Sequence, residues 1–377
     1  MNYLQLKAEL LINGIDATPE ALKDVGSAFK EQNHGLFGWD FEDHTNIALP
    51  DDFRLPNGTI VQFRRNSYSN FVVQLLDNKL ILTDGKQELC TIQWLPRPKF
   101  YIKKTISNNE MIKIGQVGGE DCLFFCYQNY CSHFVRNEQC LFCNLVATST
   151  TYNSVLRNKD TEDIGEVAKE AFSEKNVKHV LLTGGCFSHE KEIQLVSDII
   201  NSISQHTGFS SIPGTILPSP PKTVEEIERY HCSGINAIGF SIEIWDKRLF
   251  QAICPGKSKS ISHEAFVESI SKAVKIFGEG NVYGVFVMGL EPRETFLQGI
   301  RELTDLGANI VPFVWSPNPG SKFEGHRAPT SKWYIDTITE AAEIVKDARV
   351  PSGTENHCYR CDGNSLLHDA LRLKGII

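Results

Sequence analysis

The sequence lacks an excess of basic charge, a long apolar run and a secretory leader. Its 377 residues include 46 acidic and 38 basic side chains, for a net charge of −8. This balance argues against a protein that binds nucleic acid through a broad basic face. No apolar run reaches the roughly eighteen residues that a membrane span needs, and the first residues lack the basic and apolar regions of a signal peptide. We therefore expect a cytoplasmic protein with no membrane or nucleic-acid partner.

Disulfides are also not expected. The eleven cysteines are an odd number, and the cytoplasm keeps thiols reduced. The cysteines are therefore interpreted as metal ligands, reactive groups or buried apolar side chains. Four of them are isolated among apolar or loop residues and are expected to be small buried side chains: Cys90, Cys186, Cys232 and Cys254.

Residues 1–105 are predicted to form a β-rich accessory region. A helix is expected near residues 19–32. After it come "GTIVQFRRN", "NFVVQLL" and "KLILTD", short β-branched runs separated by Asn, Asp and Gly, which are typical of antiparallel strands and hairpins. The two prolines of "WLPRPKFY" indicate a boundary near residues 95–102.

From about residue 106 to 330, short apolar strands alternate with amphipathic helices. The clearest units are "KHVLLTGG" followed by "HEKEIQLVSDIINSIS", and "INAIGFSIEIW" followed by "SHEAFVESISKAVKIFG". Five such units can be counted, and "CLFFCY" would be a first strand. Repeated βα units require parallel strands covered by helices, so the sheet is either doubly wound or a barrel. In both, the chemistry lies at the carboxyl ends of the strands.

The stretch "CSHFVRNEQCLFCNL" lies at such an end and contains Cys131, Cys140 and Cys143. Two thiolates with a two-residue gap can bind one metal centre. Zinc would need a fourth ligand, which His133 or Cys126 could supply. Three thiolates on a four-iron cluster would instead leave one iron open for chemistry.

This stretch resembles the signature of the radical S-adenosylmethionine (SAM) superfamily, in which three cysteines end in Cys-x-aromatic-Cys on the loop after the first strand of a partial (β/α)6 barrel. "CLFC" matches the end of that signature. The first gap differs, because it has eight residues here and usually three, so Cys126 is a substitute candidate for Cys131. The resemblance implies a [4Fe–4S] cluster and SAM as cofactors.

Three further segments are similar to that family in the same order. "LLTGG" resembles the glycine-rich turn that holds the amino group of SAM, which implies cofactor binding at Gly184 and Gly185; the pair could equally close a strand–helix turn. "FSIEIW" resembles the strand whose Ser241 and Glu243 would reach the ribose and methionyl parts. "VFVMGLE", ending at Gly289, resembles the segment that lines the adenine.

The resemblance implies an enzyme that reductively cleaves SAM to a 5′-deoxyadenosyl radical, which abstracts hydrogen from a small-molecule biosynthetic substrate. An electron donor such as flavodoxin or ferredoxin would reduce the cluster. Modification of a peptide and transfer of the aminocarboxypropyl arm of SAM are the alternatives within the family. A non-catalytic zinc-binding interaction protein is the alternative from another class.

Two other groups of residues are candidates for function. Cys358 and Cys361, in a C-terminal segment of residues 331–377 that also contains a predicted helix, could form a second metal site with His357 or with Cys122 and Cys126. The loop cations Lys322, His326 and Arg327 could bind an anionic substrate group. We also expect residues 1–105 to cover the barrel or to dock a substrate carrier, so that their deletion would abolish turnover while leaving uncoupled cleavage of SAM.

Overall fold

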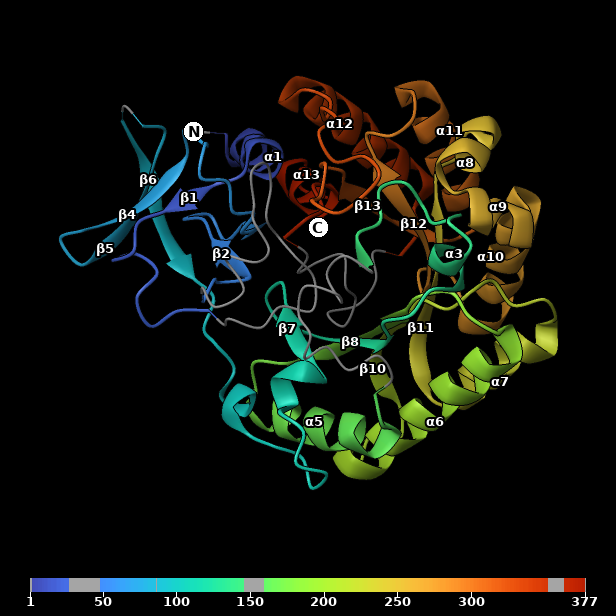
Figure 1. Ribbon diagram of the computed structural model, residues 1–377. Coiled ribbons are helices and arrows are strands. Elements are labelled where there is room, and N and C mark those ends of the chain that lie inside the picture. The colour runs from blue at the N-terminus through green and yellow to red at the C-terminus, as the bar shows by residue number, and fades with distance from the viewer. Residues whose placement is uncertain (1, 27–47, 86, 146–158, 352–362, 377) are drawn as a thin grey trace.

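The computed structural model describes residues 2–26, 48–85, 87–145, 159–351 and 363–376. It contains two sheets, one in the N-terminal region and one in the barrel (Figure 1). Cys358 and Cys361 lie outside the described residues, so the proposed second metal site stays a prediction. Within the part of the chain that is described, no helix combines the length and apolar character needed to cross a membrane.

The N-terminal region is a six-stranded sheet with one helix. The strand order is β1-β4-β5-β6-β2-β3, and β4–β5–β6 form an antiparallel meander. The elements are α1 (Tyr3–Asn13), β1 (Asp16–Ala17), β2 (Asp52–Arg54), β3 (Ile60–Gln62), β4 (Val72–Leu76), β5 (Lys79–Thr83) and β6 (Glu88–Trp94). The expected β-rich extension is confirmed. The prediction of a helix near residues 19–32 is wrong for the described part of that range, because residues 19–24 form turns. The helix of this region lies earlier, at α1, whose first turn is capped by Asn2.

The barrel sheet has the order β13-β12-β11-β10-β9-β8-β7. All of its strands from β8 to β13 are parallel neighbours in chain order, and only β7 (Gln116–Gly118) is antiparallel. The parallel strands are β8 (Cys122–Gln128), β9 (His179–Gly184), β10 (Ile212–Ile216), β11 (Ile235–Glu243), β12 (Val282–Met288) and β13 (Asn309–Val314). A doubly wound sheet reverses its strand order at a switch point. This order never reverses, so the sheet is the predicted partial (β/α)6 barrel.

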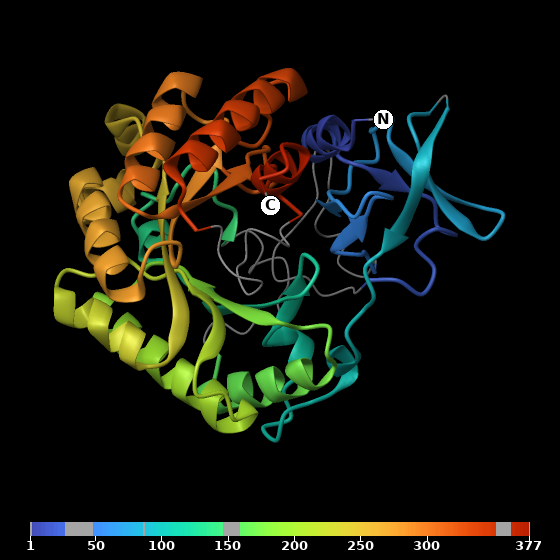
Figure 2. The ribbon, with the colours of Figure 1, turned by 180° about the vertical axis from the view of Figure 1, so that it is seen from behind.

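Helices cover the outer face of this curved sheet, as both ribbon views show (Figures 1 and 2). The described helices of the barrel and C-terminal regions are α3 (Ser132–Val135), α5 (Thr161–Ser173), α6 (His189–Thr207), α7 (Val224–Cys232), α8 (Lys247–Ile253), α9 (Pro255–Ser260), α10 (His263–Phe277), α11 (Arg293–Asp305), α12 (Ser331–Ala348) and α13 (Leu367–Leu373). Of these, α3 and α9 lie beside the cavity at the ends of the strands and contribute residues to its lining. Local sequence sets their starts: Thr223 and Glu226 form a capping box at α7.

The two regions share one continuous apolar core, which includes Phe53 of the N-terminal sheet and Phe240 of the barrel. Polar contacts join them as well. The Lys7 ammonium lies 2.8 Å from the Asp369 carboxylate, and both side chains are buried. The Gln62 amide donates to the Gly363 carbonyl at 3.1 Å. The N-terminal region is therefore fixed against the barrel.

Candidate active site

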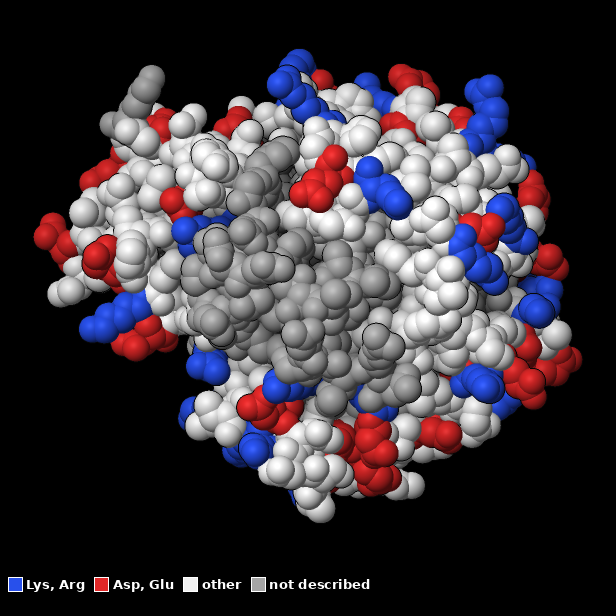
Figure 3. Space-filling model, in the orientation of Figure 1, with Lys and Arg blue, Asp and Glu red and all other residues white. Residues whose placement is uncertain are grey.

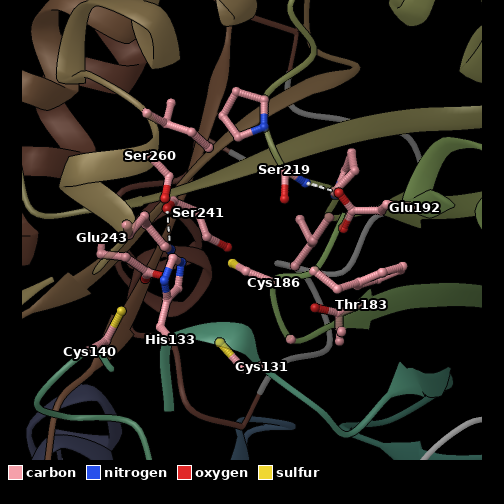
Figure 4. Close-up of a pocket in the computed structure, with 18 of the residues that line it drawn as sticks. Cys131, His133, Cys140, Thr183, Cys186, Glu192, Ser219, Ser241, Glu243 and Ser260 are labelled. Carbon is pink, nitrogen blue, oxygen red and sulfur yellow. Dashed lines mark hydrogen bonds and ion pairs between the residues drawn. The ribbon is translucent and has the colours of Figure 1, made fainter. Parts of the chain in front are cut away.

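A cavity of about 740 Å³ lies at the carboxyl ends of the barrel strands. Cys126 of β8, Thr183 of β9 and Ser241 of β11 line it, together with Lys257 of α9. Figure 4 shows side chains from these separate elements turned toward one space. The cavity is where a barrel with parallel strands places its chemistry.

The eight-residue gap between Cys131 and Cys140 contains a short helix. Cys131 directly precedes α3, and the chain then returns to the barrel through backbone hydrogen bonds. The Gly256 amide donates to the Glu138 carbonyl at 2.8 Å, and the Leu141 amide donates to the Ile253 carbonyl at 2.8 Å. The longer gap thus inserts one helical turn that is attached to α8 and α9.

The three predicted cluster ligands line the same cavity. A hydrogen bond with Cys186 lowers the pKa of Cys131 to about 5, although burial opposes it. A hydrogen bond with Cys254 likewise lowers the pKa of Cys140. Burial raises the pKa of Cys143 to about 12. The pKa values of two of the three thiols are therefore shifted downward, toward the thiolate form that binds metal.

The substitute candidate Cys126 also lines the cavity, but its thiol has another partner. It donates to the Asn129 side-chain oxygen at 2.8 Å, from a buried position on β8. The thiols of Cys131 and Cys140, in contrast, contact other thiols.

Cys186 and Cys254 are the functional candidates that sequence reasoning missed. Of the four cysteines expected to be buried, only Cys254 is fully buried; Cys90 and Cys186 are half-buried and Cys232 is exposed. Cys186 directly follows Gly185 at the end of β9, and it lines the cavity. A cysteine at the carboxyl end of a barrel strand was the available signal.

Close packing explains why Gly184 and Gly185 are glycines. A Cβ on Gly184 would lie 2.7 Å from the Tyr127 ring. A Cβ on Gly185 would lie 2.3 Å from the Tyr130 carbonyl oxygen and 2.8 Å from the Cys131 Cβ. The end of β9 therefore packs directly against the cysteine loop, and both glycines also line the cavity.

Ser241 and Glu243 reach the cavity together with a lysine that sequence reasoning did not single out. The Lys257 ammonium lies 2.7 Å from the Glu243 carboxylate and donates to the Ser241 carbonyl at 2.9 Å. Burial alone lowers the pKa of Lys257, but Glu243 and the neighbouring thiols raise it well above its usual value. Glu243 has a φ of +66°, which is uncommon for a non-glycine residue. These groups form a buried ion pair beside the thiols.

Gly289 is not among the residues that line the cavity. It follows β12 with a φ of +108°, and a Cβ there would lie 2.2 Å from the Tyr334 hydroxyl. Its role in lining adenine stays a prediction. Lys322, His326 and Arg327 are exposed and do not line the cavity, so the structure does not support the expected anion-binding loop.

A second cavity of about 380 Å³ lies between the barrel interior and the N-terminal region. It shares Phe142, Ser241 and Glu243 with the first cavity. Apolar side chains from the strands line its barrel side: Phe124, Leu181, Val285, Val287 and Phe313. Gln62 and Arg64 line its N-terminal side. The two cavities therefore meet beside the cysteine loop.

Residues 127–303 match the family model of the Radical SAM superfamily, which identifies this segment as a radical SAM domain. The protein is therefore an enzyme, and the family implies a [4Fe–4S] cluster and SAM. The donor set agrees with the cluster, since Cys131, Cys140 and Cys143 line one cavity together with the apolar side chain of Phe142.

The bacteriochlorophyllide c C-7(1)-hydroxylase of Chlorobaculum limnaeum is 25% identical over 298 residues, which are 74% of this chain and 74% of that relative. Methylornithine synthase (PylB) matches at 17% identity with a TM-score of 0.45, over 64% of this chain and 71% of that one. The maturase HydG from Carboxydothermus hydrogenoformans matches at 15% identity with a TM-score of 0.47, over 60% of this chain and 51% of that one. Neither structural likeness bears on the activity of this chain.

Proposed function

We propose that Cys131, Cys140 and Cys143 hold a [4Fe–4S] cluster and that SAM binds in the adjoining cavity. The observation that carries this proposal is that all three cysteines line one cavity at the carboxyl ends of the barrel strands. When bound, the pair supplies a 5′-deoxyadenosyl radical by reductive cleavage of SAM. The chain's own residues bind and orient SAM and exclude water from it.

The first cavity also contains the residues proposed to bind SAM. Gly184 and Gly185 bring backbone close to the cysteine loop, where a ligand's amino group can be bound. Ser241 and Glu243 come from β11 on another side of the cavity. Because Lys257 contacts both of the latter residues, it fixes their positions.

The second cavity is the proposed site of the substrate. It adjoins the first at Phe142, Ser241 and Glu243, so a molecule bound there would lie next to SAM. Its apolar barrel side would exclude water from a reactive carbon, and its polar N-terminal side would bind the substrate's polar groups. This arrangement supports a small organic molecule as the substrate and the N-terminal region as part of its site.

The alternatives within the family have less support. The relative is named as a hydroxylase, and hydroxylation replaces a C–H bond of the substrate. This likeness favours hydrogen abstraction over transfer of the aminocarboxypropyl arm. Peptide binding by strand addition needs a long free edge. Among the described strands of the N-terminal sheet, the edge strands β1 and β3 have two and three residues.

Metal analysis of anaerobically purified protein tests the proposal. We expect a brown protein with about four irons and matching sulfide. Cys140→Ala and Cys143→Ala should lose most of this iron, because each removes a ligand. Cys232→Ala is the matched control, since Cys232 is exposed at the end of α7, and it should retain all of the iron. A colourless protein with one zinc would contradict the proposal and favour the zinc-binding alternative.

A further inference from the structure

A fourth thiol lies beside the three proposed cluster ligands. The sulfurs of Cys131 and Cys186 and a ring nitrogen of His133 all lie within 4.8 Å of one another. Figure 4 shows the Cys186 sulfur in the same space as those of Cys131 and Cys140. Each thiolate of a four-iron cluster binds a different iron. Because the Cys186 sulfur lies so close to that of Cys131, rotation of its side chain away from Cys131 would bring it toward the iron that the other three cysteines leave open.

The backbone fixes this proximity. The Ser132 amide donates to the Cys186 carbonyl at 2.8 Å, and the Gly185 amide donates to the Gln128 carbonyl at 2.9 Å. Gly185 leaves no room for a side chain between the end of β9 and the cysteine loop. Cys186 is thus held beside Cys131 by the hydrogen bonds of its own carbonyl and of the preceding Gly185 amide.

Cys186 is a better candidate ligand than the other nearby donors. His133 is already engaged, because its Nδ1 lies 3.0 Å from the Arg136 guanidinium, and iron–sulfur centres favour thiolate ligands. Cys254 has no exposed surface, whereas Cys186 is half-buried and lines the cavity.

We propose that Cys186 is an exchangeable fourth thiolate ligand, which binds the cluster's remaining iron before SAM arrives and leaves it when SAM binds. This inference rests on the proposed function. The exchange breaks the bond between iron and the Cys186 sulfur. The sulfur takes the proton that the SAM ammonium loses as its nitrogen becomes a ligand. No electron is transferred, so no oxidant or reductant is required.

The test compares reconstituted wild-type protein with Cys186→Ala, and with Cys186→Ser as a closer match in size. Each is oxidised with ferricyanide without SAM, and three-iron clusters are measured by electron paramagnetic resonance. An iron without a protein ligand is lost more readily. We expect Cys186→Ala to form several-fold more three-iron cluster than the wild type. It should also bind SAM about tenfold more tightly, because no ligand must be displaced. Cys186→Ser should be intermediate, and Cys232→Ala should match the wild type.

Equal three-iron yield and equal SAM affinity in wild type and Cys186→Ala would overturn the inference. So would failure of both Cys186 variants to bind four irons while Cys232→Ala binds them, because Cys186 would then be a permanent ligand. A wild-type protein that binds no iron would instead contradict the proposed function itself. The two failures are therefore distinguishable.

Discussion

At the scale of single residues, Glu243 and Lys257 form a buried ion pair in the site. Their side chains are 12% and 10% exposed, and their charged atoms lie 2.7 Å apart. Removing two charges from water costs several kcal/mol per ion, which mutual attraction offsets only while both are present. The ion pair therefore joins the end of β11 to α9, and loss of either charge leaves the other buried without a partner.

Replacement of Lys257 by Met should lower the free energy of unfolding by about 3–5 kcal/mol, because it leaves the Glu243 carboxylate buried without its cation. The double variant Lys257→Met/Glu243→Gln should recover a large part of this loss, since it removes both charges. Urea denaturation of metal-free protein measures both effects. Strictly additive losses in the double variant would contradict the predicted coupling.

Glu192 should make stability depend on pH. Burial raises its pKa above 4.5, although hydrogen bonds from Ser219 and Tyr127 oppose the shift. The folded state therefore holds this proton more tightly than the unfolded state does. The resulting stabilisation is present at low pH and is lost as pH rises through the folded pKa.

The prediction for Glu192 is tested against Glu192→Gln, which stays uncharged. From about pH 4.5 to pH 7.5, the free energy of unfolding of the wild type should fall relative to that of the variant. Denaturant titrations of both proteins across this window provide the measurement. A difference that stays constant, or that grows in favour of the wild type, would show that Glu192 is not the responsible group.

At the scale of elements, Tyr334 connects the ends of two barrel strands to α12. Its hydroxyl group lies 3.2 Å from the Met288 carbonyl oxygen and 2.9 Å from the Trp315 carbonyl oxygen. Gly289 makes room for this hydroxyl. The last two βα units are thus joined by one buried side chain.

Gly289→Ala should destabilise the protein by about 2 kcal/mol or more, because the new methyl group meets the Tyr334 hydroxyl at an unfavourable positive φ. Tyr334→Phe in the same chain should restore part of the stability by removing the clash but not the backbone strain. Thermal unfolding of the two single variants and the double variant is the measurement. Additive destabilisation would mean that the hydroxyl is not the obstacle.

At the scale of the whole molecule, Arg64 joins the N-terminal sheet to the barrel. Its guanidinium donates to the Leu11 carbonyl at 3.1 Å, the Val314 carbonyl at 3.2 Å and the Ser316 hydroxyl. It is also buried at the edge of the second cavity. On the outer surface, basic and acidic side chains are interspersed on the face shown in Figure 3.

Arg64→Ala should loosen the N-terminal region without removing the cluster site. We expect several-fold faster proteolysis within residues 1–105, because the variant leaves buried acceptors without a donor. Uncoupled cleavage of SAM should persist. Arg64→Lys keeps the charge but not the planar set of donors, and its proteolysis rate should be intermediate. Unchanged proteolysis in Arg64→Ala would contradict a joining role. This variant is a milder change than deletion of residues 1–105, which would expose the shared core.

Much of the fold could be predicted because local patterns dictate it. The β-branched runs became β3, β4 and β5, and the βα alternation became β9 to β13 with their helices. The choice between a barrel and a doubly wound sheet needed strand order, which periodicity does not contain. Lys257 and Cys186 were missed for a related reason. Neither residue belongs to a recognisable motif in its own segment. Their contacts with other site residues form only when β9, β11 and α9 come together at the cavity.

The most direct test of the central claim is the nucleoside released when reduced, anaerobically reconstituted protein is incubated with SAM. The account predicts 5′-deoxyadenosine together with methionine, and no release from Cys140→Ala. Release of 5′-methylthioadenosine alone would indicate cleavage of a different bond of SAM. That result, or intact SAM beside a reduced four-iron cluster, would contradict the account.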